Sequence, residues 1–269
     1  MAGGDGVSRT KRFLIQSGVV LAVLLAWEFG ARAAEIPWFP PPGEIAVELH
    51  KDYFSGPWQH FFLTEQATGN WGPSLLRLVT GWALASLAGV FLGIALGRSG
   101  RLSEYFDPVL QFGRAIPPPM LIPFFIVLLE LGPQMHLATI VFGVIWPVLI
   151  NSIDGARYVD RQYMETAEVF GVSRADRLFR VILPAAAPKI FAGLRLSLSL
   201  SLILLVLAEM TGSTEGLGHR LLDDQRNFEV PGMWGGIILL GVLGVLLNTS
   251  FLAVERRVLA WHLRARQIS

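Results

Sequence analysis

The amino-acid sequence predicts an all-α integral membrane protein with about six transmembrane helices. Of its 269 residues, 52% are hydrophobic and only 16% are charged, and the mean hydropathy is +0.51. A typical soluble domain has about 25% charged residues. Apolar runs of about 20 residues, the length that crosses a bilayer as a helix, recur along the chain. The chain contains no cysteine, which excludes disulfides and cysteine-based metal or redox sites.

The N-terminal part of the chain is predicted to hold a short tail, one membrane span and a loop. We assign residues 1–12 to a cytoplasmic tail. We assign residues 13–73 to the first transmembrane helix, about Phe13–Ala34, and an extracytoplasmic loop. No small-residue cleavage site ends the first apolar run, so we expect an anchor helix rather than a cleaved signal. The loop carries aromatic residues that suit an interfacial helix, among them Trp58, Phe61 and Phe62.

Residues 74–254 are predicted to form the core domain, followed by a cytoplasmic C-terminal tail at 255–269. About five further spans are expected, at about 74–97, 108–131, 136–153, 190–210 and 233–254. In the first of these, small residues recur at every fourth position: Gly81, Ala85, Gly89, Gly93 and Gly97. This spacing places a groove along one helix face and allows a neighbouring helix to approach closely.

The span at 108–131 is interrupted by prolines and is the leading candidate for lining a substrate path. Asp107 and Pro108 are predicted to be its N-cap and first-turn proline. Residues 117–119 and Pro123 break its backbone, since proline removes a hydrogen-bond donor. Broken backbone at membrane depth either lines a cavity or is buried in protein, so a kink used only for packing is the alternative. The candidate path residues are Gln111, Ile116, Pro117, Pro118, Ser197, Ser201 and Glu209.

Ionisable side chains are scarce within the spans, and they are costly in hydrocarbon. Two interpretations stay open for Glu209. It either borders the outer mouth of a path or makes structural hydrogen bonds that hold the loop up to Gly218, and we favour the structural role. Ser197 and Ser201 share a helix face with Ala208, which is also typical of a close helix contact.

The placement of basic residues predicts which side of the membrane each loop faces. With the N-terminus inside, 15 of the 22 Lys and Arg residues fall on cytoplasmic segments and 4 fall on the opposite side. Cytoplasmic loops carry an excess of Lys and Arg. Both termini and the loop at 161–184 are therefore expected to be cytoplasmic.

The loop at 161–184 is polar and lies between two very apolar regions. Gly171 separates a first helical piece, about Tyr163–Phe170, from a second, about Arg174–Val181. Two prolines are predicted to end the second piece: Pro184 and Pro188. Three cations recur every third residue and share roughly one helical face: Arg174, Arg177 and Arg180. Two short helices joined at a glycine suit a docking surface better than a catalytic pocket.

The same loop resembles the cytoplasmic loop of inner-membrane permease subunits of prokaryotic ABC importers. The pattern of that family is E-A-A, three residues, G, nine residues and I-x-L-P. This chain matches the spacing, with Thr166 for Ala and Val181 for Ile as mild departures. In that family the loop docks in a groove of the ATPase subunit. The resemblance implies these coupling residues: Glu165, Thr166, Ala167, Gly171, Arg174, Asp176, Arg177, Leu183 and Pro184.

From about residue 74 to the C-terminus, the chain is similar to permeases for sulfonates, taurine, nitrate and related small molecules. The matching positions include Ser74, Arg77, Asp107-Pro108, Ile116-Pro117-Pro118, Ala208-Glu209-Met210, Gly216-Leu217-Gly218 and Glu255-Arg256-Arg257. The resemblance implies a five-helix type I importer permease core plus one N-terminal helix, working as a homodimer in the bacterial inner membrane. It also implies two ATPase subunits on the cytoplasmic side, which would bind ATP and Mg²⁺, and an extracytoplasmic solute-binding protein.

No motif supports an enzyme or a nucleic-acid-binding protein. There is no G-x-x-x-x-G-K-[ST] phosphate loop, so the chain is not expected to bind or hydrolyse ATP, and no cofactor of its own is expected. The histidines are scattered without metal-ligand spacing. The alternative function is an ion-gradient-driven secondary transporter. It predicts interrupted helices in repeated halves and a buried carboxylate, and the halves show no clear repeat.

Overall fold

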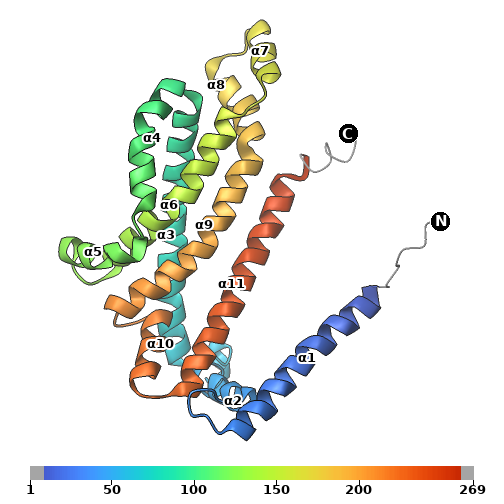
Figure 1. Cartoon of the computed structure of the whole chain (residues 1–269), viewed down its shortest axis with the longest axis vertical. Coiled ribbons are helices and arrows are strands. Elements are labelled where there is room, and N and C mark those ends of the chain that lie inside the picture. Colours follow the sequence, from blue (N-terminus) through green and yellow to red (C-terminus); the bar gives the residue numbers. More distant parts are fainter. Residues whose placement is uncertain (1–8, 262–269) are drawn as a thin grey trace. The chain divides into compact units, whose positions relative to one another are not determined.

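The computed structural model describes residues 9–261, and every regular element among them is a helix (Figure 1). The predicted tails at 1–12 and 255–269 therefore lie partly outside the described residues. Inside that range, α1 begins at Arg9 and α11 continues to Val258, so both helices extend into the predicted tails. By length and composition, five helices can cross a membrane, or up to six if one bent pair is counted as a span.

The elements follow one another with short connections. In chain order they are α1 (Arg9–Ala34), α2 (Pro42–Tyr53), η1 (Trp58–His60), α3 (Glu65–Arg98), α4 (Gly100–Ala115), η2 (Pro118–Leu121), α5 (Ile122–Leu129), α6 (Pro133–Arg157), α7 (Arg161–Val169), α8 (Arg174–Asp176), η3 (Arg177–Ile182), α9 (Leu183–Gly212), α10 (Leu217–Arg226) and α11 (Val230–Val258). All the predicted spans except the one at 108–131 lie inside the single helices α1, α3, α6, α9 and α11, each of which is longer than predicted.

The contacts divide the chain into two compact units. Unit 1 comprises residues 1–68 and 220–239, and unit 2 comprises residues 69–219 and 240–269, each described over its part of 9–261. The unit boundary falls within α3, near the predicted domain boundary at 73. Residues 220–239 belong to unit 1, although the sequence assigned them to the core domain.

Unit 1 is held together by an aromatic cluster. The ring of Trp27 on α1 stacks on Phe39 with centroids 5.3 Å apart and lies 5.4 Å from Trp234. The rings of Phe39 and Trp234 meet edge to face at 5.5 Å. Such arrangements are favoured because each ring has a negative face and a positive edge, and they also bury apolar area. On the same helix, the carboxylate of Glu28 accepts from the amide of Gly43 at 2.7 Å, which ties α1 to the start of α2.

A second anchor of unit 1 is a group of carboxylates around Arg220. Its guanidinium lies 3.1 Å from Asp52 of α2, 2.8 Å from Asp224 of α10 and 3.4 Å from Glu229. Asp224 is fully buried, and burial outweighs the pull of Arg220, raising the pKa of Asp224 to about 6. Burial likewise raises the pKa of Tyr53 to about 12. The cluster joins α2 to α10 through Arg220, Asp52 and Asp224, which are largely removed from water, whereas Glu229 is half exposed.

In unit 2, the small residues of α3 form the predicted groove, and α6 lies in it. A Cβ added at Gly81 would come within 2.8 Å of Ile140, and one at Gly89 within 2.9 Å of Val148. At Gly93 an added Cβ would lie 2.8 Å from the carbonyl oxygen of Leu149. The close approach of the two helices therefore depends on the missing side chains, as small-residue packing in membranes requires.

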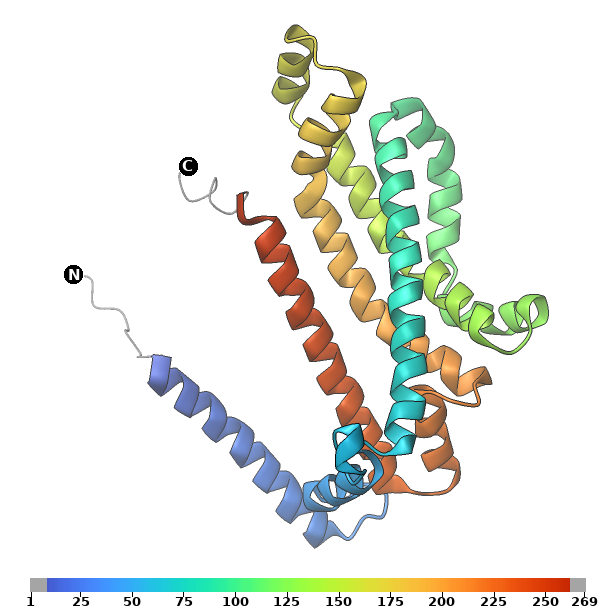
Figure 2. The same cartoon turned by 180° about the vertical axis from the view of Figure 1, so that it is seen from behind.

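Helix α9 packs against α6, and both views show α3, α6 and α9 side by side (Figure 1, Figure 2). The apolar core of unit 2 comes from α3, α6, α9 and the second half of α11: Leu78, Ala85, Ile140, Val144, Leu198, Leu204, Leu205 and Phe251. Trp82 of α3 packs edge to face on Phe251 at 6.0 Å. Interdigitated apolar side chains thus fill the space between these four helices.

The region of the predicted span at 108–131 differs from the prediction. Helix α4 begins at Gly100, where the Ser99 hydroxyl caps it by accepting from the amide of Leu102 at 3.3 Å. Asp107 and Pro108 therefore lie inside α4, so their assignment as a helix start is wrong. The prolines do break the chain: α4 and the segment Pro118–Leu129 meet at 83°. Residues 118–129 then pack against α6 and α9 through Ile122, Met135 and Ala208.

We expect Gly93→Ala to weaken the contact of α3 with α6, because the added methyl group meets backbone of α6 that cannot rotate away. Overpacking of this kind costs about 1–3 kcal/mol. A lower midpoint of thermal unfolding in detergent would report the effect. Gly69→Ala, on the same helix but with open space around its Cβ, is the matched control. Equal midpoints for the two variants would contradict the packing argument.

We expect the stability of the chain to fall as the pH rises through the range set by Asp224. Its pKa is raised from 3.8 to about 6, so between about pH 4 and pH 6 the folded state holds a proton that the unfolded state has released. The contribution of Asp224 to stability is complete below its pKa in the unfolded state and is lost above its pKa in the folded state. Asp224→Asn should remove this part of the pH dependence of the unfolding midpoint, and Asp223→Asn should retain it. An unchanged slope in Asp224→Asn would refute the assignment.

Candidate functional site

The loop at 161–184, which we call the coupling loop, begins with α7. The carboxylate of Asp160 caps this helix by accepting from the amide of Gln162 at 2.9 Å. The helix ends in a Schellman turn: Gly171 donates to the carbonyl of Glu168 at 3.0 Å, and Val172 donates to Ala167 at 2.9 Å. Gly171 adopts φ +64°, which favours glycine, and the space around it is open. The separation of two helical pieces at Gly171 is confirmed.

The second piece of the coupling loop is continuous with α9. Ser173 caps it: its hydroxyl accepts from the amide of Asp176 at 3.1 Å and donates to the carboxylate of Asp176 at 2.7 Å. The chain then forms a π-helical segment, η3, and enters α9 at Leu183. The prediction that Pro184 and Pro188 end this piece is wrong. A π turn shifts the hydrogen bonds to i→i+5, and Pro184 falls in the first turn of α9, where its missing N–H is tolerated.

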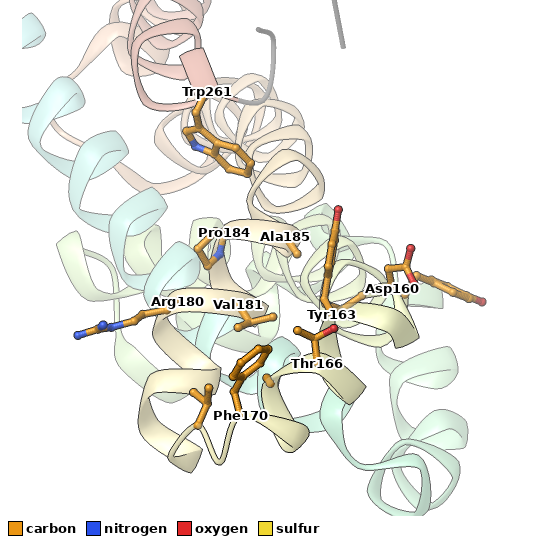
Figure 3. A pocket seen from close by; sticks show the side chains of 13 residues that line it. Asp160, Tyr163, Thr166, Phe170, Arg180, Val181, Pro184, Ala185 and Trp261 are labelled. Carbon is orange, nitrogen blue, oxygen red and sulfur yellow. The ribbon is translucent and has the colours of Figure 1, made fainter. Parts of the chain in front are cut away.

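Between the two pieces lies a concavity of about 830 Å³ (Figure 3). Its walls are mostly apolar, from Tyr163 and Phe170 on the first piece and Val181 and Pro184 on the second. Trp261, which follows α11, closes one side. An open apolar hollow of this size, with few polar groups, suits the packing of another protein segment better than the binding of a small polar molecule.

The predicted coupling residues are not equally accessible. Four are exposed: Glu165, Thr166, Gly171 and Arg174. Four are half-buried: Asp176, Arg177, Leu183 and Pro184. Ala167 is buried and therefore supports the loop from beneath rather than offering a contact. The three cations also differ, because Arg180 pairs with Asp176 at 3.0 Å whereas the exposed side chain of Arg174 has no ion pair among those found in residues 9–261.

Sequence reasoning missed the apolar tip of the coupling loop. Val169 is 83% exposed and Phe170 is 79% exposed, immediately before the turn at Gly171, and Tyr163 is also exposed. Large apolar side chains that are exposed together on one loop indicate a contact surface. The signal in the sequence was the Val-Phe pair next to the predicted glycine, within a segment otherwise rich in charge.

The predicted path residues fall into two groups. Gln111, Ile116, Pro117 and Pro118 lie around the 83° bend after α4, with Gln111 and Pro117 exposed. Ser197 and Ser201 of α9 are fully buried. The indole N–H of Trp82 donates to the Ser197 hydroxyl at 2.9 Å, and Ser201 donates to the carbonyl of Leu198 at 2.7 Å. The serines thus take part in helix contacts within the chain, and a role in a substrate path stays a prediction for both groups.

Glu209 lies at the centre of a buried polar cluster. Its carboxylate accepts from the hydroxyl of Ser74 at 2.8 Å and from the guanidinium of Arg77 at 2.9 Å, both on α3. It also accepts from the amide of Gly218 at 3.0 Å. The guanidinium of Arg77 also forms an ion pair with the carboxylate of Glu215 at 2.7 Å. The favoured structural interpretation of Glu209 therefore agrees with the geometry, because its bonds hold residues 215–218 in place.

The loop from Ser213 to Gly218 is shaped around this carboxylate. The amide of Leu217 donates to the Ser74 hydroxyl at 2.9 Å, and the amide of Gly216 donates to Asn70 at 2.8 Å. Gly216 adopts φ +116°, and a Cβ there would come within 2.5 Å of the Glu209 carboxylate. A Cβ at Gly218 would collide with the carbonyl of Val206. Both glycines are thus required by the close approach of the loop to Glu209.

We expect Glu209→Gln to destabilise the chain strongly, because Arg77 would keep a buried charge without a buried partner. Breaking one side of such a pair typically costs about 3–5 kcal/mol. Glu215→Gln is the matched control, since Glu215 contacts the same guanidinium but is half exposed, and we expect a change below about 1 kcal/mol. The measurement is the thermal midpoint in detergent. Similar losses in both variants would show that Glu209 is not the central group.

The comparisons with known proteins agree with one another. Residues 85–260 match the family model described as binding-protein-dependent transport system inner membrane component. The chain is 31% identical over 255 residues to the SsuC protein of Bacillus subtilis, which is named as an aliphatic sulfonates transport permease; the match covers 93% of this chain and 89% of that protein. It is 29% identical over 253 residues to the taurine transport system permease protein TauC of Escherichia coli, covering 90% and 88%.

A solved structure shows the same fold. The chain superposes on a chain of the MetNI methionine ABC transporter, in inward-facing conformations, with a TM-score of 0.62 and 17% identity, covering 69% of this chain and 93% of that one. This likeness supports the fold only. Together with the family match over residues 85–260, the helical membrane architecture and the coupling loop, it leads to one conclusion: the chain belongs to the family of inner-membrane components of binding-protein-dependent transport systems.

Proposed function

We propose that this chain forms the membrane path of an ATP-driven importer for a small polar or anionic compound. The family membership supports the role of a permease subunit. The relatives are named for aliphatic sulfonates, taurine, nitrate and bicarbonate, which are small and carry an anionic oxygen-rich group. A sulfonate, taurine, nitrate or a similar compound is therefore the proposed substrate class.

The coupling loop is the observation that carries this proposal. It combines the spacing from Glu165 to Pro184 with an exposed apolar tip at Val169 and Phe170. We propose that this tip and the hollow behind it receive a separate ATPase subunit, which supplies the ATP and Mg²⁺ sites. Exposed aromatic residues at a rigid turn are suitable anchors, since a few buried aromatic side chains carry most of the binding energy of an interface.

Motion of the coupling loop would reach the membrane through α9. The second piece of the loop continues through η3 into α9, a helix of 30 residues with a length of about 45 Å. Near its far end Glu209 bonds to α3 and to the loop at 215–218. In the proposed cycle, ATP binding draws two ATPase subunits together, and the permease responds as a two-state element that opens alternately to each side.

The remaining partners follow from the same proposal. Two copies of the chain enclose the path, and each coupling loop contacts one ATPase subunit on the cytoplasmic side. Both termini face the cytoplasm, in agreement with the distribution of Lys and Arg. An extracytoplasmic solute-binding protein delivers the substrate to the opposite face of the inner membrane.

We expect the detergent-solubilised chain to co-purify with its ATPase subunit when the two are produced together, and Phe170→Ser to weaken that complex by about 10-fold or more, as loss of an interface anchor does. Gly171→Asp should uncouple ATP hydrolysis from uptake, since it places a charge and a side chain at a left-handed turn. Complex stability is measured by size-exclusion chromatography, and uptake in vesicles.

Tyr105→Ser is the matched control, because Tyr105 is an equally exposed aromatic residue on α4, outside the coupling loop. It should leave both complex formation and coupling unchanged. A wild-type chain that purifies alone and takes up substrate on an ion gradient without ATP would overturn the proposal.

A further inference from the structure

Residues 54–64, which we call the aromatic loop, connect α2 to α3 and present three large side chains outward. Trp58 is 75% exposed, Phe61 is 87% exposed and Phe62 is 61% exposed. None of the residues 54–64 is Asp, Glu, Lys or Arg. Single exposed apolar residues are ordinary, but an uncharged cluster of three aromatic side chains on one loop is a contact surface.

The backbone of the aromatic loop directs these side chains outward. Phe61 and Phe62 both adopt positive φ, 53° and 63°, a conformation that bulky residues rarely take. Hydrogen bonds hold the loop in this conformation. The amide of Gly56 donates to the carbonyl of Phe62 at 2.9 Å, and the amide of Phe61 donates to the carbonyl of Trp58 at 3.1 Å. A Cβ at Gly56 would collide with the carbonyl of Leu63. The loop is thus built in a fixed shape that keeps its aromatic rings out of the protein interior.

The aromatic loop is joined directly to a membrane span. Thr64 closes the loop by donating its amide to the carbonyl of Tyr53 at 3.2 Å, and its hydroxyl accepts from the amide of Ala67 at 3.0 Å in the first turn of α3. By length and composition, the candidate span that contains α3 begins at Trp58 and continues to Arg98. The aromatic loop is therefore continuous along the chain with this candidate span.

The chemistry of the aromatic loop fits a lipid surface. Charged residues reappear on both sides of it, at Lys51, which pairs with Glu48 at 2.7 Å, and at Glu65. Trp and other amphipathic aromatic rings are enriched where the hydrocarbon meets the headgroups, and an uncharged aromatic surface gains free energy by entering that layer. An uncharged aromatic surface that is continuous along the chain with a candidate span therefore fits a lipid surface, and docking of a protein is the alternative that the test distinguishes.

We propose that the aromatic loop is a membrane-interface anchor that inserts Trp58, Phe61 and Phe62 into the headgroup and upper acyl layer of the extracytoplasmic leaflet. It fixes the depth at which α3 enters the bilayer. The anchor is distinct from the coupling loop and needs neither the ATPase nor the substrate. Its test therefore stands or fails separately from the proposed transport function.

The absence of native cysteine makes the test direct, because one introduced cysteine carries one spin label. The full chain with Phe61→Cys, and separately with Trp58→Cys, is labelled and reconstituted in vesicles of phosphatidylethanolamine and phosphatidylglycerol. Collisions with oxygen, which concentrates in lipid, are compared with collisions with a water-soluble nickel chelate. At both positions we expect the spin label to collide with oxygen several-fold more often than with the nickel chelate.

Lys51→Cys is the matched control, on the exposed face of α2 just before the aromatic loop, and there the nickel chelate should dominate. Nickel-dominated collisions at positions 58 and 61 would overturn the proposal. So would labels that are shielded from nickel only after the extracytoplasmic solute-binding protein is added, because the aromatic loop would then be a protein-docking surface. Folding of each variant is checked by size-exclusion chromatography. Because two positions are labelled separately, the test can still be read if one substitution disrupts the fold.

Discussion

The carboxylate of Glu209 is the interaction on which the arrangement of unit 2 depends. It gathers donors from α3, through Ser74 and Arg77, and from the start of α10, through the amide of Gly218. A polar group inside a membrane protein has little water to replace a lost partner, so each bond must be made within the chain. Arg77 offsets the charge, and Glu215 occupies the remaining side of its guanidinium. The result is one fully paired group that joins α3, α9 and the connection to α10.

Close helix packing is the second feature that holds unit 2 together. The stripe of small residues on α3 lets α6 approach until backbone and side chains touch, as the contacts at Gly81, Gly89 and Gly93 indicate. Helix α9 uses the same device, since a Cβ at Gly193 would lie 2.8 Å from the carbonyl of Pro147 on α6. In lipid, apolar burial gives little drive for helices to associate, so dispersion contacts at short distance must supply it.

In the proposed importer, close helix packing would let a movement of the coupling loop reach the opposite end of the same chain. The coupling loop has a fixed turn at Gly171 and an unbroken connection through η3 into α9. At the other end of α9, Glu209 holds the loop at 215–218. In the proposed importer, α9 therefore links the ATPase contact to the extracytoplasmic loop. The apolar residues at the tip of the coupling loop face outward, as the proposed contact with an ATPase subunit requires.

The sequence by itself determined the all-helical membrane class, five of the spans, the α3 groove and the two-piece coupling loop. Each of these follows from local composition or spacing: apolar length, a four-residue period and one glycine between helical segments. It also favoured the structural role of Glu209, as the residue that holds the loop up to Gly218, although an ionisable residue inside a bilayer indicates a functional site by default.

Tertiary structure alone decided the features that depend on neighbours distant in the chain. Asp107-Pro108 did not start a helix, because Ser99 caps α4 earlier, and Pro184 did not end one, because a π turn precedes it. The shared face of Ser197 and Ser201 indicated a close helix contact, but only the structure shows that both are fully buried and that Trp82 bonds to Ser197. The positive φ of Phe61 and Phe62 likewise comes from bonds across the aromatic loop. Periodicity reports which residues share a face, but only the packed chain shows what that face meets.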